Sequence, residues 1–375
     1  MSPVVQRRLV IVGVWLATKV LVLGSVAVAN WPRLQEGGWA AYLRLWRQWD
    51  TTWFESIVVT GYGQPYGPDF PYYVNNIAFF PGFPLLMEAG TALGLAPVAA
   101  GIAVSAIASL VAAFAIARLT EGVGGRGEWG VIALLVAPTA LFLTAAYTEA
   151  LFAAFAFWAW VQARNGRWVW AGVLAGAAAV VRSNGLFLMA GLVLMFLLSR
   201  PWRSPRPALE WAKGSALLLP LVTTMAYFAY LWTLTSSWTA WFTAQTDEWE
   251  RGFVNPVTAL LNTWERVFTF DPASAFSSRY VAELVAMALL LALLVVLSAR
   301  RMWPEALYTA VTAAALTTST TYHSIPRTLV VIFPLWMLIG LLLTRRVWMR
   351  WVYVLACLPL LVLVTLRFTQ AQWIS

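Results

Sequence analysis

An aspartate stands inside a tryptophan-rich segment near the start of the chain. Residues 39–63 read WAAYLRLWRQWDTTWFESIVVTGYG, and the spacing of their aromatic residues predicts an amphipathic helix lying in a membrane interface. Asp50 falls within about 40° of Trp46 on that helix, inside the aromatic stripe and away from the polar side with Glu55. A carboxylate among indole rings is desolvated, which suits a general base or a hydrogen-bonding anchor. The alternative is a kink at Asp50, whose carboxylate then caps the helix that follows.

Three further polar turns interrupt the apolar remainder of the chain. They contain Tyr147-Thr148-Glu149, Arg182-Ser183-Asn184-Gly185 and His323-Ser324-Ile325-Pro326-Arg327. Ionisable side chains at membrane depth usually face a cavity or a partner, and two arginines with a histidine are suited to clamp a phosphate. Two other interpretations stay open. Arg182 and Arg327 would extend to lipid headgroups, and Glu149 would form a purely structural ion pair with an arginine.

The composition excludes a soluble protein. Of the 375 residues, 61% are hydrophobic and 11% are charged, and the mean hydropathy is +0.72. Soluble domains are about 45–50% apolar and about 25% charged. The polar residues are too few to cover a water-facing body of this size. We therefore expect an all-α polytopic membrane protein whose backbone polar groups are satisfied within helices.

The charged and metal-ligating residues narrow the possible chemistry. The net charge of +9 is carried almost wholly by arginine, since only Lys19 and Lys213 are lysines. Cytoplasmic loops of membrane proteins collect basic residues, so we expect no nucleic-acid partner. The single cysteine, Cys357, excludes an internal disulfide and a cysteine-cluster metal site. The single histidine, His323, excludes a histidine-rich metal centre, and catalysis must rely on carboxylates, arginines, aromatic rings and one imidazole.

Eleven apolar runs are candidates for membrane spans of about 20 residues. We interpret the first as an uncleaved span, although its end, Ala27-Val28-Ala29, resembles a signal-peptidase site. No repeat or soluble domain interrupts the chain, which predicts a single integral membrane domain over residues 1–375. The runs cover residues 9–29, 97–117, 129–146, 148–163, 168–181, 185–199, 214–235, 280–299, 304–321, 328–344 and 351–366.

The positions of the arginines predict the orientation of these spans. A full crossing by residues 78–95 would place the basic groups after 199, 299 and 344 outside, against the positive-inside rule. We therefore expect 78–95, with Pro81 and Pro84, to dip into the outer leaflet or lie along it. The N-terminus is then cytoplasmic. Residues 30–96 and 236–279 form two long extracytoplasmic loops, and the polar turns lie on the same side as Asp50.

Several of these motifs together resemble a known family. The order WD, GYG, AFFPGFPLL, AAYTEALF, RSNGLF and HSIPRTLVVIFPLW resembles the PIG-V group of GPI mannosyltransferases and its bacterial relatives, within the GT-C class of integral-membrane glycosyltransferases. The resemblance extends over residues 46–335. It is carried by Trp49-Asp50, Gly61-Tyr62, Ala78-Phe79-Phe80-Pro81 with Pro84, Tyr147-Thr148-Glu149, Arg182 with Asn184-Gly185, Pro326-Arg327 and Phe333-Pro334.

The resemblance implies a GT-C-like fold, a polyprenyl- or dolichyl-phosphate sugar donor, usually of mannose, and a catalytic aspartate that maps onto Asp50. The chain departs from the family at Thr52-Trp53-Phe54, where His or Tyr is frequent. It also departs at Asn75-Asn76-Ile77, where an acidic residue is common. These departures bear on the identity of the acceptor, which we expect to be a lipid-linked or surface glycan.

The residues and the resemblance lead to one mechanistic hypothesis. Asp50 takes the proton of an acceptor hydroxyl as it attacks the anomeric carbon, with inversion, while Arg182, Arg327 and His323 hold the departing lipid phosphate. No metal or other cofactor is required, although Asp50 and Glu149 could together hold a metal. The expected substrate-binding residues are Trp49, Trp53, Tyr62, Tyr147, Glu149 and Asn184.

Two other function classes remain open. A transporter or flippase of lipid-linked sugars would share the membrane fold and a basic, aromatic cavity. Transporters commonly show paired halves, and no such duplication is visible here. A non-catalytic scaffold would have no evident use for the polar turns.

Overall fold

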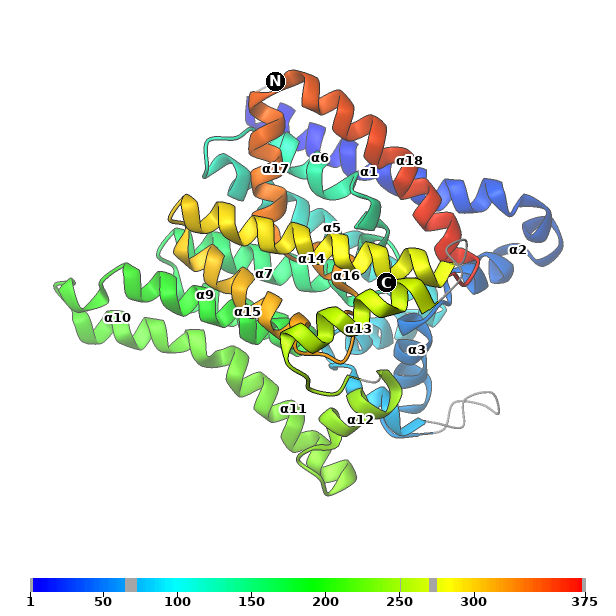
Figure 1. Ribbon diagram of the computed structural model, residues 1–375, viewed down its shortest axis with the longest axis horizontal. Helices are drawn as coiled ribbons and strands as arrows, with labels where there is room; N and C mark the ends of the chain where they lie inside the picture. The colour runs from blue at the N-terminus through cyan, green and yellow to red at the C-terminus, as the bar shows by residue number, and fades with distance from the viewer. Residues whose placement is uncertain (1–2, 65–72, 250, 270–274, 373–375) are drawn as a thin grey trace. The chain divides into compact units, whose positions relative to one another are not determined.

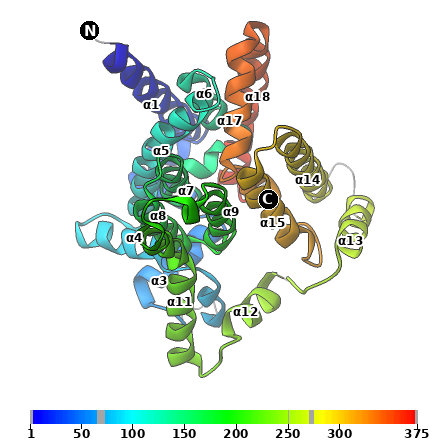
Figure 2. The same ribbon diagram turned by 90° about the vertical axis from the view of Figure 1, so that its left-hand side faces the viewer.

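The computed structural model describes residues 3–64, 73–249, 251–269 and 275–372. Within these ranges the regular secondary structure is helical, and the β-type pairing is one isolated bridge between Phe253 and Ser319. Figures 1 and 2 show the helices coloured along the chain. The all-α prediction is confirmed for the described residues.

The chain forms two compact units. Unit 1 consists of Met1–Thr52, Leu86–Phe157 and Arg327–Ile374, and unit 2 consists of Trp53–Leu85 and Trp158–Pro326. Four helices, α3 (Asp50–Thr60), α4 (Gly82–Ala92), α7 (Thr148–Arg164) and α16 (Ile325–Leu329), begin in one unit and continue into the other. The prediction of a single domain concerns how the two units assemble, and it stays a prediction.

Unit 1 brings together the two ends of the sequence. Helix α18 lies against α1, and α17 packs against both α5 and α6 (Figures 1 and 2). A Cβ on Gly340 would lie 2.6 Å from the Cα of Gly130, so α17 and α6 approach this closely because both residues lack side chains. The other elements of this unit are α1 (Pro3–Ala29), α2 (Trp31–Trp46), α5 (Pro97–Glu121), α6 (Gly127–Leu135), η2 (Pro138–Leu143), α16 (Ile325–Leu329, which enters it at Arg327), α17 (Phe333–Arg345) and α18 (Val347–Thr369).

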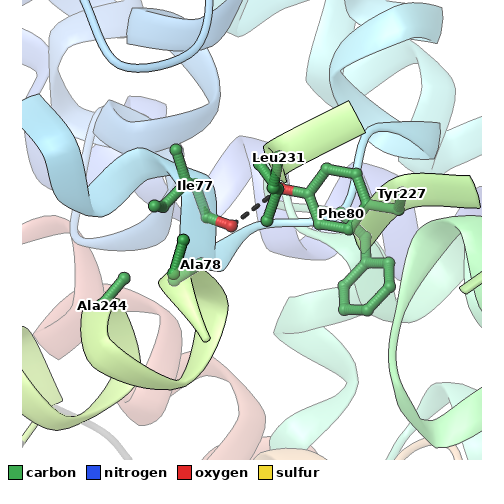
Figure 3. Close-up of a cluster of buried hydrophobic side chains, with 7 residues drawn as sticks. Ile77, Ala78, Phe80, Tyr227, Leu231 and Ala244 are labelled. Carbon is green, nitrogen blue, oxygen red and sulfur yellow. Dashed lines mark hydrogen bonds between the residues drawn. The ribbon is translucent and has the colours of Figure 1, made fainter. Parts of the chain in front are cut away.

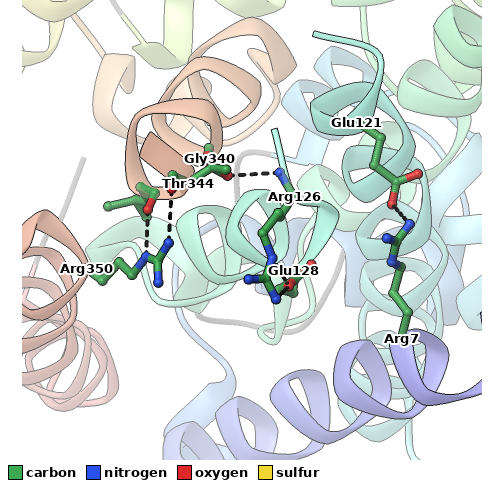
Figure 4. Close-up of polar contacts among 8 residues, drawn as sticks. Arg7, Glu121, Arg126, Glu128, Gly340, Thr344 and Arg350 are labelled. Atoms are coloured by element: carbon green, nitrogen blue, oxygen red, sulfur yellow. Dashed lines mark hydrogen bonds and ion pairs between the residues drawn. The ribbon is translucent and has the colours of Figure 1, made fainter. Parts of the chain in front are cut away.

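Arginines that the sequence places on the cytoplasmic side form hydrogen bonds at helix ends of unit 1 (Figure 4). The backbone N–H of Arg126 donates to Thr344 Oγ1 at 2.9 Å. Arg350 donates to the carbonyls of Leu343 and Thr344 at 2.7 and 3.0 Å. Its guanidinium also lies 4.4 Å from the ring centroid of Trp129. These contacts connect the end of α17 and the start of α18 to Arg126, which precedes α6, and to Trp129 in α6.

Unit 2 is built around two helix pairs, α8 with α11 and α9 with α15. A separate cluster of buried side chains forms where η1 meets α11 and α12 (Figure 3). In it, the Tyr227 hydroxyl donates to the carbonyl of Ile77 at 2.7 Å. The elements of this unit are η1 (Tyr73–Ala78), α8 (Trp168–Val181), α9 (Asn184–Leu198), η3 (Pro201–Arg203), α10 (Pro207–Gly214), η4 (Ser215–Leu218), α11 (Leu219–Thr235), α12 (Ala240–Trp249), α13 (Pro256–Thr269), α14 (Ala275–Ala299) and α15 (Trp303–Thr317).

Among the described residues, six helical stretches are long and apolar enough to cross a membrane. The chain is therefore a multi-pass membrane protein, while the expected number of eleven spans is not confirmed. The six stretches are Val5–Ala29, Pro97–Glu121, Asn184–Arg203, Pro207–Thr235, Ser278–Ala299 and Val347–Thr369, and Trp168–Val181 and Phe333–Arg345 are shorter apolar helices.

Two of the predicted spans are interrupted, and proline occurs at both interruptions. The run 129–146 is helical as α6 only to Leu135, and Pro138 then opens the 3₁₀ helix η2. The run 328–344 becomes a regular helix only at Phe333, followed by Pro334. Proline lacks the N–H that a helix interior needs. The resulting non-helical segments carry carbonyl groups that must find other partners.

The segment 78–95 does not form a helix long enough to cross a bilayer. Helix α4 has 11 residues, which at about 1.5 Å per residue gives about 16 Å, against about 30 Å of hydrocarbon. It starts at Gly82, where a Cβ would lie 2.9 Å from the carbonyl oxygen of Val180 at the end of α8. Helix α4 is thus too short for a full crossing, and its expected position in or along the outer leaflet stays a prediction.

The predicted continuous helix through Asp50 is wrong, because the chain breaks at residues 47–49, directly before Asp50. The capping role that the alternative gave to the Asp50 carboxylate stays a prediction. Helix α2 ends at Trp46, α3 begins at Asp50, and between them Trp49 has a φ of 51°. Periodicity did not reveal the break because the aromatic spacing continues across it. In the structure, the Tyr147 hydroxyl donates to the carbonyl of Gln48 within this break.

Candidate active site

Asp50, Arg327 and Glu149 form an ion-paired cluster inside unit 1. Arg327 Nη1 donates to Asp50 Oδ2 at 2.5 Å, and Arg327 Nε lies 3.0 Å from Glu149 Oε1. The exposed fractions of the Arg327, Asp50 and Glu149 side chains are 13%, 12% and 0%. Two carboxylates thus share one guanidinium, and together the three groups carry one net negative charge.

Each member of the cluster stands beside an interruption in the chain. Asp50 is the first residue of α3, Glu149 lies in the first turn of α7, and Arg327 belongs to the five-residue helix α16. Carboxylates are favoured in the first turn of a helix because the backbone N–H groups there have no helical partner. The helix breaks therefore position the carboxylates, and the arginine pairs with both.

Two aromatic rings lie against the arginine. The guanidinium carbon of Arg327 is 5.3 Å from the ring centroid of Tyr147 and 5.9 Å from that of Phe142. The Tyr147 hydroxyl donates to the carbonyl of Gln48 at 3.3 Å, and thereby binds the break between α2 and α3. Tyr147 is 2% exposed, and its contacts with Arg327 and Gln48 link the cluster to the break.

Burial and the charges of the cluster shift the pKa values of Arg327 and Tyr147. Burial by itself lowers the pKa of a guanidinium, but the carboxylates of Asp50 and Glu149 outweigh it and raise the pKa of Arg327 above its ordinary value. Burial, together with the charge of Asp50, raises the pKa of the Tyr147 phenol well above its ordinary range. Arg327 therefore stays a cation and Tyr147 a neutral donor across the physiological range.

The remaining predicted residues are divided between the two units. Trp49 belongs to unit 1 and is 37% exposed. In unit 2, Trp53 stacks on Phe79 with ring centroids 6.3 Å apart, and the Tyr62 hydroxyl donates to the carbonyl of Phe79 at 2.9 Å. Arg182, which follows α8, lies 3.5 Å from the Oδ1 of Asn184 at the start of α9.

His323 lies in unit 2 beside an arginine that the sequence did not single out. Arg279 Nη2 is 2.6 Å from His323 Nε2 and 3.2 Å from Nδ1. Glu283 accepts the backbone N–H groups of Ser324 and Ile325 at 2.7 and 2.8 Å, and so fixes the turn that follows the histidine. Glu283 is 0% exposed. The sequence did not single out Glu283, although an ionisable residue inside an apolar run is a signal that could have found it.

Lys19 is likewise an ionisable residue inside an apolar run, and the sequence-based prediction did not include it among the site residues. Its Nζ donates to the carbonyl of Leu143 at 2.6 Å and to Thr144 Oγ1 at 2.8 Å. In the part of the chain that the structure describes, no three His, Cys, Asp or Glu side chains gather as a metal site would require. The expectation of a metal-independent reaction stays untested.

Comparisons with known proteins agree on one family. A family model described as Mannosyltransferase (PIG-V) matches residues 17–204, a range that includes Asp50, Glu149 and Arg182. GPI alpha-1,6-mannosyltransferase 2 of Mus musculus is 34% identical over 197 residues, covering 48% of this chain and 38% of its own length. The Homo sapiens protein of that name is 36% identical over 153 residues, covering 37% and 29%. The chain thus matches less than two fifths of the length of these curated relatives.

A solved structure gives a more distant likeness. A crystal structure of ArnT from Cupriavidus metallidurans bound to undecaprenyl phosphate aligns with 79% of this chain and 55% of that one. The TM-score is 0.47 and the sequence identity 15%. The sequence matches, and not this likeness, carry the family assignment.

Proposed function

This chain belongs to the PIG-V family of mannosyltransferases, and on that premise we propose that it transfers a mannosyl group from a polyprenyl-phosphate donor to a glycolipid or glycan acceptor. The names of its matched relatives, GPI mannosyltransferases, support mannose as the sugar. The observation that carries the proposal is the buried Asp50–Arg327–Glu149 cluster. It holds a carboxylate in one place at the position where the family resemblance puts the catalytic aspartate.

In the proposed reaction Asp50 is the general base. Because Arg327 binds its Oδ2, Oδ1 is the oxygen that takes the proton from the acceptor hydroxyl. The hydroxyl oxygen forms a bond to the anomeric carbon as the bond from that carbon to the donor phosphate breaks. The bonding pair leaves with the phosphate oxygen, so a single displacement inverts the configuration at the anomeric carbon.

Arginines stabilise the negative charge that develops on the departing phosphate. Arg327 has donors beyond the two that face Asp50 and Glu149, and we assign it to the donor phosphate together with Arg182 and His323. Trp49, Trp53, Tyr62, Tyr147, Glu149 and Asn184 are proposed to bind or position substrate. No cofactor enters this reaction, because the guanidinium groups supply the positive charge.

We place the reaction on the extracytoplasmic face, with the N-terminus in the cytoplasm. The distribution of arginines supports this orientation. Glu149 also lies where the apolar runs 129–146 and 148–163 meet, at the end that this orientation places outside.

An assay of the purified protein in detergent tests the proposal against the flippase alternative. With polyprenyl-phosphate mannose and a panel of glycolipid acceptors, we expect labelled mannose to move to an acceptor. A flippase needs two compartments, so it would leave the donor intact in detergent. In sealed right-side-out vesicles, a membrane-impermeant acceptor added outside should also be mannosylated; labelling only in inverted vesicles would contradict the orientation.

A further inference from the structure

A non-helical segment inside unit 1 contains Tyr147 and leads directly to Glu149, both of which are proposed for the site. The 3₁₀ helix η2 ends at Leu143 and α7 begins at Thr148, and the intervening residues lie in a buried turn. Tyr147 closes this turn, and Glu149 follows in the first turn of α7. Buried carbonyl groups outside a helix must be hydrogen-bonded from elsewhere, since an unsatisfied one is costly.

Side chains from three other helices satisfy this turn. Thr51 Oγ1, from α3, lies 3.3 Å from the carbonyl oxygen of Ala146, and Ser105 Oγ, from α5, lies 3.2 Å from that of Tyr147. Lys19, from α1, donates to the carbonyl of Leu143 and to the hydroxyl of Thr144. Within the turn, the Tyr147 N–H donates to the carbonyl of Ala145 at 2.8 Å. The carbonyls of Leu143, Ala146 and Tyr147 accept from the three side chains of other helices.

Lys19 is the donor that needs an explanation, because a neutral side chain would serve a carbonyl equally well. It is 6% exposed and lies in the middle of an apolar, membrane-spanning stretch, where a charged group is costly. Its acceptors are a carbonyl oxygen and a hydroxyl oxygen of the turn, so its bonds to this one segment offset the cost of burying it.

We propose that Lys19 is a positioning residue that holds the turn of residues 143–147, and through it Tyr147 and Glu149, in the geometry of the site. It acts from 124 residues away in the sequence, and it does not belong to any of the motifs that carry the family resemblance. The expected effect of Lys19 on catalysis rests on the proposed function. The hydrogen bonds by which Lys19 holds the turn do not depend on it.

Hydrogen exchange followed by mass spectrometry tests the hold on the turn without any substrate. In Lys19→Met, which keeps the length of the side chain and removes its donors, we expect the backbone amides of residues 144–149 to exchange about 10- to 100-fold faster. Thr18→Val is the matched control: Thr18 is also buried in α1, but its hydroxyl bonds the carbonyl of Trp15 within its own helix. Unchanged exchange in the turn of Lys19→Met would overturn the proposal.

Kinetics test the consequence for catalysis. Per folded molecule, Lys19→Met should lower kcat for mannosyl transfer about 10- to 100-fold with little change in KM, because misplacing a catalytic group mainly affects the transition state. Lys19→Gln, which keeps an N–H donor, should retain more of kcat than Lys19→Met. A purely structural role would reduce the yield of folded protein and leave kcat per folded molecule unchanged, and that result would overturn the proposal.

The exchange experiment and the kinetic experiment together distinguish failure of this proposal from failure of the proposed function. If the wild-type protein transferred no mannose, the proposed function would fail while the exchange experiment still decided on Lys19. If transfer occurred and Lys19→Met exchanged and reacted like the wild type, the positioning role alone would fail.

Discussion

Replacement of Asp50 by asparagine is expected to lower kcat for mannosyl transfer about 100- to 10,000-fold, the usual contribution of a general base. Asparagine has nearly the shape of aspartate and still offers an oxygen to Arg327, so the ion-paired side of the site keeps an acceptor. It cannot take the proton of the acceptor hydroxyl. The measurement is transfer from a radiolabelled polyprenyl-phosphate mannose by equal amounts of folded wild-type and variant protein.

The control for this variant is Glu36→Gln, which neutralises an exposed carboxylate of α2. It should transfer mannose at the wild-type rate. Donor binding should also survive in Asp50→Asn, because its phosphate is assigned to the arginines. Transfer by Asp50→Asn at near the wild-type rate would remove Asp50 from the role of base.

The second large effect is expected from Arg327→Ala. Removing the guanidinium leaves the carboxylates of Asp50 and Glu149 buried beside each other without their cation, and breaking a buried pair in this way costs about 3–5 kcal/mol. The denaturation midpoint in detergent should fall accordingly, and mannosyl transfer should fall with it. Arg367→Ala, at an exposed position of α18, should change stability by no more than about 0.5 kcal/mol.

A double variant separates charge repulsion from lost packing. Adding Glu149→Gln to Arg327→Ala removes one of the two unmatched carboxylates, so the double variant should be more stable than Arg327→Ala alone. Equal instability of the two proteins would show that the arginine matters through its contacts with Tyr147 and Phe142. In that case the electrostatic account of the cluster would be wrong.

The sequence predicted the helices more accurately than the places where they stop. Uninterrupted apolar runs such as 97–117 and 280–299 correspond closely to α5 and α14, because a membrane-spanning segment must satisfy its backbone within a helix. The breaks after Leu135 and before Phe333 were missed, although Pro138 and Pro334 mark both. A hydropathy average cannot distinguish a regular helix from a buried turn whose carbonyls are bound by distant side chains.

The same limit applies to the candidate site. The position of Asp50 among tryptophans singled it out, and the polar turns singled out Glu149 and Arg327. The sequence offered no means of pairing residues that lie up to 277 positions apart. It gave structural pairing of Glu149 with an arginine as one of two interpretations, and the structure shows such a pair. Lys19 was overlooked because a single lysine in the first apolar run was treated as part of the charge count.

The configuration of the product tests the central claim most directly. If Asp50 is the base of a single displacement, mannose transferred from a polyprenyl-phosphate donor labelled with ¹³C at the anomeric carbon must appear in the product with that carbon inverted. The one-bond carbon–hydrogen coupling at that position, measured by NMR on the product of the purified protein, distinguishes the two anomers. The account predicts inversion; retention would require a covalent intermediate and would contradict the role given to Asp50.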